Sequence, residues 1–161
     1  MIEPLIAIDL GVRPASGLIT GTEARPVLIE ARRFPRFEAG PFVGVLEGWL
    51  EEWPRAEVWC EETYSQRGEE RPWLRDVGRL QEGQAGFIGG MLGRELSRVS
   101  PCSDVEARVA WGIFGRPEEG AGAVGEHVRD MLAVALKALI RRAERLKARA
   151  GRSDDGGETM R

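Results

Sequence analysis

Cysteine is scarce in this sequence, with only Cys60 and Cys102 among its 161 residues. Two thiols so far apart in the chain fit neither a disulfide framework nor a zinc site, so we expect both to be reduced. Long hydrophobic runs are also missing: none approaches the ~20 residues of a membrane span, and no signal-peptide pattern opens the chain. These absences predict a cytoplasmic protein with no membrane partner.

Hydrophobic residues make up 42% and aromatic residues 7% of the chain, which is typical of a soluble globular protein. The length suits one domain, which we expect over residues 1–150, followed by a disordered tail at 151–161. The net charge of -3 argues against a nonspecific nucleic-acid coat. Positive charge is nevertheless concentrated between Lys137 and Arg152, where Glu144 is the single acid among seven Lys or Arg residues.

The segment Leu5–Gly11 is an apolar run, LIAIDLG, that contains one carboxylate, Asp9. Such a run indicates a buried central strand, because an exposed strand alternates apolar with polar residues. Burying an unpaired carboxylate is costly, so we expect Asp9 at the mouth of the strand beside water, a metal ion or a cation. The alternative is an Asp that only turns the chain into the Gly11 loop.

Two more strands are predicted at Ser16–Thr20 and Val27–Phe34, and their short connections make the first three strands antiparallel neighbours. Apolar residues then recur at helical spacing from Phe42 to Trp53, ahead of a fourth strand at Val58–Cys60. A helix that connects two strands normally makes them parallel neighbours, so the fourth strand should lie beside the first.

Parallel strands end at the same edge of a sheet, so Asp9 and Glu61 should end neighbouring strands about 4.8 Å apart. One divalent ion can reach both carboxylates, and a cation relieves their repulsion. Strand alternation allows only one of Glu61 and Glu62 to face inward.

In the second half of the chain, the sequence predicts a polar loop at residues 63–72 and then a helix from Trp73. This helix contains six glycines between Gly78 and Gly93. We expect these glycines to allow close approach of the sheet or of a second subunit. A weak fifth strand at Ser97–Pro101 and a short helix at Asp104–Ile113 follow.

The last predicted helix has an apolar stripe and carries Glu126, His127 and Asp130 in its first turns. His127 and Asp130 are three residues apart, so they share a helix face and can converge on one ion. The alternatives are an incidental histidine and an Asp that merely interacts favourably with the helix dipole.

Four short segments, in this order, resemble motifs of the RuvC family of Holliday junction resolvases, which belongs to the ribonuclease H-like superfamily. Asp9–Arg13 with Gly17 resembles the Asp-Pro-Gly-Ser-Arg opening, and Val58–Glu61 with Tyr64 resembles the hydrophobic-Glu-x-x-Phe segment. Gly83–Ala85 resembles Leu-Gly-Gln-Ala, and Asp130–Ala135 resembles Asp-Ala-Leu-Ala-x-Ala. The resemblance covers most of residues 3–140 and implies an α/β domain of ribonuclease H-like fold, with a mixed five-stranded sheet flanked by helices.

By position, Asp9, Glu61 and Asp130 match the metal-binding carboxylates of that family, and His127 matches its fourth site residue. The resemblance therefore implies a site for two Mg2+ ions, for which Mn2+ substitutes, that activate water and stabilise both reacting oxygens. Imidazole is a poor ligand for Mg2+, so it stays open whether His127 binds metal or transfers protons. Participation of Glu62 or Glu126 stays open as well.

The resemblance also implies DNA contacts. Tyr64 matches the aromatic residue that contacts bases near the crossover. The candidates for contact with DNA backbone phosphates are the basic end of the last helix and Arg67, Arg71 and Arg75. Residues 104–125 depart from the family because they are fewer and carry acids where the family has lysines, and the candidate substitutes there are Arg108 and Arg116.

The activity implied is that of a crossover junction endodeoxyribonuclease. It would nick four-way DNA junctions symmetrically, leave 5'-phosphate and 3'-hydroxyl ends, and act as a homodimer with the helix over residues 73–93 as a candidate contact. The alternatives are an RNA–DNA hybrid nuclease or a catalytically weak DNA-binding module of the same fold. An actin-like or sugar-kinase-type nucleotide binder also opens with a strand and Asp-x-Gly, but this chain is too short for its two halves.

Overall fold

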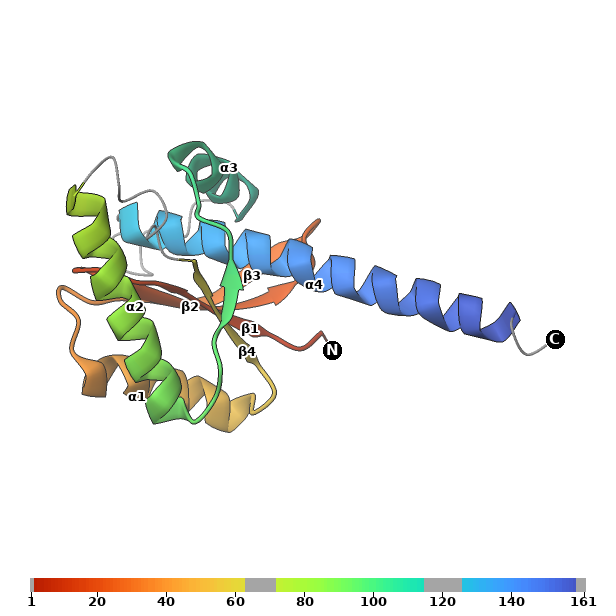
Figure 1. Cartoon of the computed structure of the whole chain (residues 1–161), viewed down its shortest axis with the longest axis horizontal. Helices are drawn as coiled ribbons and strands as arrows, with labels where there is room; N and C mark the ends of the chain where they lie inside the picture. The colour runs from red at the N-terminus through yellow and green to blue at the C-terminus, as the bar shows by residue number, and fades with distance from the viewer. Residues whose placement is uncertain (1, 63–71, 115–125, 159–161) are drawn as a thin grey trace.

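The computed structural model describes residues 2–62, 72–114 and 126–158, and the side chains of residues 2–62, 76–114 and 128–152. Its elements, in chain order, are β1 (Leu5–Asp9), β2 (Ala15–Gly21), β3 (Pro26–Arg33), α1 (Ala39–Glu52), β4 (Glu57–Glu61), α2 (Pro72–Leu92), β5 (Ser97–Val99), α3 (Asp104–Phe114) and α4 (Glu126–Glu158). Figure 1 shows a sheet with α1 and α2 on one face and with α3 and α4 on the other.

The five strands form one sheet in the order β3-β2-β1-β4-β5. The pairs β1–β2 and β2–β3 are antiparallel, whereas β4 runs parallel to both β1 and β5. This arrangement confirms the predicted mixed sheet, including its antiparallel first three strands. The helix α1 begins before Pro41, which is tolerated because the N–H groups of a first helical turn have no partner within the helix.

The central strand β1 is buried on both faces, as its apolar sequence predicts. Ile6 and Ile8 pack with residues of α1 and α2 such as Phe42 and Ile88. Leu5 and Ala7 instead join a second apolar cluster that is built mainly from the first turns of α4. The sheet is thus fixed from both sides along the strand that carries Asp9.

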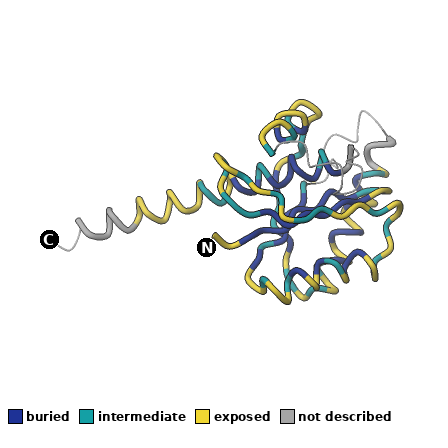
Figure 2. Tube along the Cα trace, turned by 180° about the vertical axis from the view of Figure 1, so that it is seen from behind, coloured by how far each residue is buried: buried dark blue, intermediate teal, exposed yellow. Residues whose placement is uncertain are grey.

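The helix α4 continues beyond the body of the protein, as Figures 1 and 2 show. Its residues from Val128 to Leu139 contribute to the apolar core, whereas those from Glu144 to Arg152 are all exposed. The structure assigns helix to residues 151–158, which belong to the expected tail. The single domain over residues 1–150 stays a prediction. No helix in the described part of the chain is long and apolar enough to cross a membrane.

Candidate functional site

Asp9 and Glu61 end β1 and β4, the two central parallel strands. Their register pairs Leu5 with Glu57 and Ala7 with Trp59, so both strands reach the same edge of the sheet. Asp9 is only 8% exposed. Glu61 is partly buried and the adjacent Glu62 is exposed, so strand alternation turns Glu61 toward the interior.

Asp130 reaches the same region because α4 lies very close to β2. A Cβ atom placed on Gly17 would lie 2.6 Å from the Sδ atom of Met131, which is nearer than atoms can pack. Because Gly17 has no side chain, Met131 can pack directly against β2 at this point. Asp130 precedes Met131 in α4 and is partly buried.

The charges of these acids act on one another. Burial, together with the negative charges of Asp9 and Asp130, raises the pKa of Glu61 from its ordinary value of 4.5 to about 7, against the lowering effect of the hydrogen bond from Cys102. Like charges disfavour ionisation in this way only when they are close. The structure thus brings Asp9 and Asp130 within electrostatic reach of Glu61.

Within residues 2–62, 76–114 and 128–152, no group of three or more His, Cys, Asp or Glu side chains is arranged closely enough to hold a metal ion. The Oε2 atom of Glu61 instead accepts a hydrogen bond of 2.8 Å from the Cys102 amide. Carboxylate oxygens are the donors that Mg2+ prefers, and a cation lowers the repulsion between them. The donor set therefore fits a divalent cation in its chemistry, although these side chains are not drawn together around one.

Two glutamines of α2 hold the loop that follows Asp9. The Gln84 amide accepts a hydrogen bond of 2.9 Å from the Gly11 N–H and donates one of 2.8 Å to the Gly11 carbonyl. Gln81 donates to the Leu10 carbonyl at 3.1 Å. Gly11 has a φ angle of 143°, which side-chain-bearing residues rarely adopt. The chain immediately after Asp9 is thus fixed to α2.

Lys137 of α4 holds the segment that contacts Glu61. Its Nζ atom donates hydrogen bonds to the carbonyls of Ser100 and Pro101, at 3.2 and 3.0 Å, and forms an ion pair of 2.8 Å with Glu106. This segment leads directly into Cys102, whose amide binds Glu61. Lys137 therefore supports the position of Glu61 without contacting it.

Several predicted site residues lie outside the described part of the molecule. They are Tyr64, Arg67, Arg71 and Arg116, together with the side chains of Arg75 and His127. Arg108 is described: it is largely exposed on α3 and forms an ion pair of 3.0 Å with Asp104.

Sequence reasoning missed Gln81, Lys137 and the Cys102 amide. Gln81 and Gln84 had a detectable signal, because two polar residues three apart on the apolar face of one helix indicate a buried hydrogen-bonding pair. The Cys102 amide had none, since every residue other than proline carries the same donor.

No family model matches the chain, and no curated protein matches it in sequence. Its structure is similar to that of T. thermophilus RuvC in complex with a Holliday junction substrate, with a TM-score of 0.57 and 17% sequence identity. The similarity covers 87% of this chain and 96% of the other. The predicted ribonuclease H-like fold, as in RuvC, is confirmed.

Proposed function

We propose that the chain is a metal-dependent endonuclease that resolves four-way DNA junctions by paired nicks, leaving 5'-phosphate and 3'-hydroxyl ends. The observation that carries this proposal is the convergence of Asp9, Glu61 and Asp130 at one edge of a ribonuclease H-like sheet, where burial and the charges of Asp9 and Asp130 raise the pKa of Glu61. Such crowding of acids destabilises a protein unless a cation compensates it, so it is more typical of a site than of a core.

In this proposal Asp9, Glu61 and Asp130 hold two Mg2+ or Mn2+ ions, and His127 binds metal or moves a proton. The bound ions would supply an activated water and charge stabilisation at the attacking and leaving oxygens. Glu61 must lose its proton to act as a metal ligand. The hydrogen bond from the Cys102 amide favours this deprotonated form. Gln84 would keep Asp9 in place by fixing the Gly11 loop.

Paired nicks require two copies of the chain, and α2 is the contact that we propose. Leu80, Phe87 and Met91 recur at helical spacing on this helix and are 41%, 54% and 46% exposed. A Cβ atom placed on Gly83 or Gly90 would meet nothing within 4 Å, so the helix backbone is accessible there. Exposed apolar side chains beside bare backbone favour packing against a second helix.

Cleavage of labelled four-way junction, flap, duplex and RNA–DNA hybrid in Mg2+ or Mn2+ tests the function. We expect paired nicks in the junction, and a rate at least about a hundredfold lower for Asp9→Asn, as for loss of other charge-stabilising groups. The matched control is Glu47→Gln, which removes an exposed carboxylate from α1 and should leave the rate unchanged. A folded wild-type protein that cuts none of the four substrates would contradict the proposal.

A DNA-binding module with little or no catalysis is the second candidate. It is favoured by the spacing of the described acids, none of which form a ready group of three metal ligands. Junction binding without cleavage, equal in the wild type and in Asp9→Asn, would support it. Preferential cutting of the RNA–DNA hybrid would instead indicate a ribonuclease.

A further inference from the structure

A cavity of about 410 Å3 lies where α4 leaves the body of the protein. It is bordered by the residues that precede β1 and by Glu57, the first residue of β4. The acids Asp9 and Glu61 end these strands, so the cavity lies at the opposite edge of the sheet. Its remaining wall is one face of α4, with Arg142, Arg145 and Arg149.

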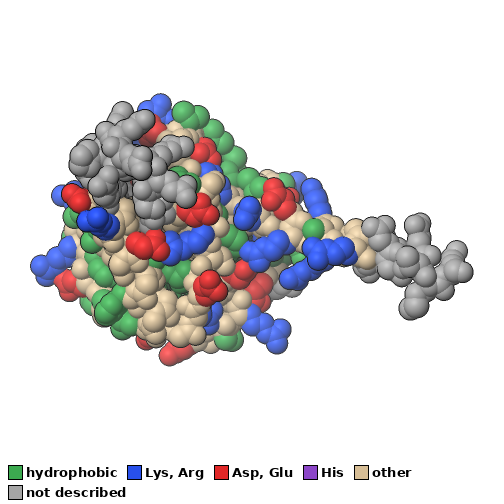
Figure 3. Space-filling model, in the orientation of Figure 1, with side chains coloured by type: hydrophobic (Ala, Val, Ile, Leu, Met, Phe, Trp, Pro, Cys, Tyr) green, Lys and Arg blue, Asp and Glu red, His purple; other side chains and the backbone are tan. Residues whose placement is uncertain are grey.

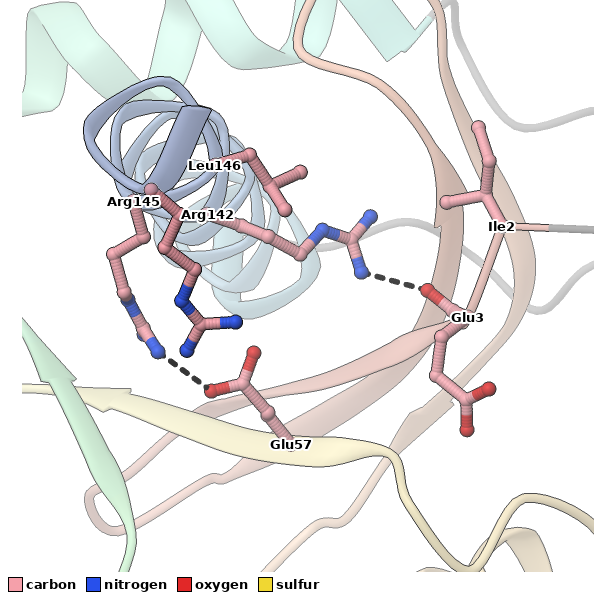
Figure 4. Close-up of a pocket in the computed structure, with 7 residues that line it drawn as sticks. Ile2, Glu3, Glu57, Arg142, Arg145 and Leu146 are labelled. Atoms are coloured by element: carbon pink, nitrogen blue, oxygen red, sulfur yellow. Dashed lines mark hydrogen bonds and ion pairs between the residues drawn. The ribbon is translucent and has the colours of Figure 1, made fainter. Parts of the chain in front are cut away.

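Arg142 is held in the cavity wall by neutral partners. Its guanidinium donates a hydrogen bond of 2.6 Å to the main-chain carbonyl of Glu3 (Figure 4). It donates a second, of 3.1 Å, to the main-chain carbonyl of Gly21. It forms no ion pair with any described residue, and burial lowers its pKa, against the negative charges of Glu57, Glu23 and Glu3. A partly buried guanidinium that contacts only carbonyls can bind an anion as well.

The other two arginines differ in how they are held. Arg145 lies over the Trp59 ring, 5.0 Å from its centroid, and forms an ion pair of 3.3 Å with Glu57. Arg149 is exposed and has no hydrogen bond or ion pair with another described residue. Three guanidinium groups and two carboxylates, those of Glu3 and Glu57, thus line the cavity, and the charge of Glu23 also acts on Arg142.

A phosphate group is the anion that suits this arrangement. The planar guanidinium presents parallel N–H donors that match pairs of phosphate oxygens, and it is more weakly hydrated than an ammonium group. Further positive charge lies near the cavity, because Arg141 and Arg152 are also exposed on this helix. Figure 3 shows Lys and Arg side chains gathered where this part of α4 leaves the body.

We propose that this cavity binds a backbone phosphate of a DNA arm that lies along the exposed part of α4. The inference rests on the proposed function, and it extends the DNA contact to the edge of the sheet opposite the carboxylates. A linear row of cations favours a polymer of phosphates over a single small phosphate. The branched substrate would then contact the protein at two separate surfaces.

The test measures binding of a fluorescent four-way junction by fluorescence anisotropy. EDTA is present throughout, so that no divalent ion is available for cleavage. Arg149→Gln should weaken binding about tenfold, because it removes a charge-assisted hydrogen bond to phosphate. The slope of log Kd against log salt concentration should fall by about 0.9. Lys147→Gln is the matched control: it removes an exposed charge from the same helix, outside the cavity lining, and should change Kd less than about twofold.

Equal losses in the two variants would overturn the proposal, because the effect would then be general electrostatic attraction. A third outcome also overturns it: inorganic phosphate at about 10 mM raises the Tm of the wild type but not of Arg149→Gln, while both bind DNA equally. The cleavage assay separates this inference from the function. If the protein is inactive but Arg149→Gln weakens junction binding as expected, only the proposed nuclease function is refuted. If the protein cleaves the junction but Arg149→Gln has no such effect, only the proposed phosphate site is refuted.

Discussion

At the scale of single residues, Gln84 connects two segments that are 73 residues apart in the chain. Both polar groups of Gly11 use this side chain as their partner, and Gln84 itself is only 5% exposed. A side-chain amide carries its donor and its acceptor on separate atoms, so one side chain satisfies a peptide N–H and a peptide C=O together. The residue that resembles a family motif therefore has a physical role at the Asp9 loop.

Gln84→Ala should reduce the free energy of unfolding by about 1–3 kcal/mol, since it leaves buried polar groups of Gly11 without partners. Urea denaturation measures this loss. Arg79→Ala, at an exposed position of the same helix, should cost less than about 0.5 kcal/mol. If the two variants lost equal stability, the hydrogen bonds to Gly11 would not contribute as described.

The pKa of Glu61 predicts how stability depends on pH. The pKa is about 7 in the folded protein against 4.5 ordinarily, so between these values the folded chain binds more protons than the unfolded chain. The stabilising contribution of this carboxyl is present below pH 4.5 and is lost as the pH rises through 7.

In EDTA, the free energy of unfolding of the wild type should therefore fall from about pH 5 to about pH 8 relative to that of Glu61→Gln. Chemical denaturation of both proteins at each pH measures the difference. Parallel pH profiles would show that Glu61 ionises normally. Mg2+, which needs the carboxylate form, should raise the Tm of the wild type more at about pH 8 than at about pH 6.

At the scale of secondary structure elements, α4 consists of two parts with different energetics. Leu139 is 1% exposed in the apolar core, whereas Leu146 is 59% exposed on the part that extends beyond the body. Leu139→Ala should cost about 2–5 kcal/mol of unfolding free energy, and Leu146→Ala less than about 0.5 kcal/mol. Thermal and urea denaturation of the two variants provide the comparison. A large loss for Leu146→Ala would mean that this part of the helix is packed in solution.

Much of the element order follows from the sequence. Apolar periodicity predicts α1 and the core part of α4, and a helix between two strands explains why β1 and β4 are parallel. The extension of α4 past residue 150 was not predicted, because Gly151 and the later glycines disfavour helix. The Ala, Arg, Lys and Glu residues before them favour it, and local propensity alone does not decide between the two.

Some features of the candidate site could also be predicted from the sequence, and others could not. Asp9 and Glu61 were expected side by side because strand ends are fixed by topology. The Lys137 contacts with Ser100 and Pro101 were not, since they join α4 to a loop that has no pattern of its own. Tertiary hydrogen bonds of this kind depend on distances that periodicity does not encode.

At the scale of the whole molecule, the sheet separates an acidic edge from a basic one. Asp9, Glu61 and Asp130 gather at one edge, and the Arg142 cavity lies at the other. The exposed apolar side chains of α2 form a third surface. These three surfaces are compatible with the charge and the symmetry of the proposed junction substrate.

Phe87→Asp should convert the proposed homodimer to a monomer, because a carboxylate in an apolar contact is costly to desolvate. Light scattering coupled to size-exclusion chromatography gives the mass directly. The control is Val109→Asp on α3, where the valine is similarly exposed at 53% and no contact is proposed. A dimer that survives Phe87→Asp, or a wild-type monomer, would contradict the assignment of α2.

The carboxylate edge draws its members from the first strand and from the last helix, Asp9 and Asp130. A ribosome must therefore synthesise the chain at least as far as Asp130 before these groups can meet. Until that moment the emerging polypeptide has the acids but not their arrangement, so the proposed nuclease would be inactive during most of its own translation.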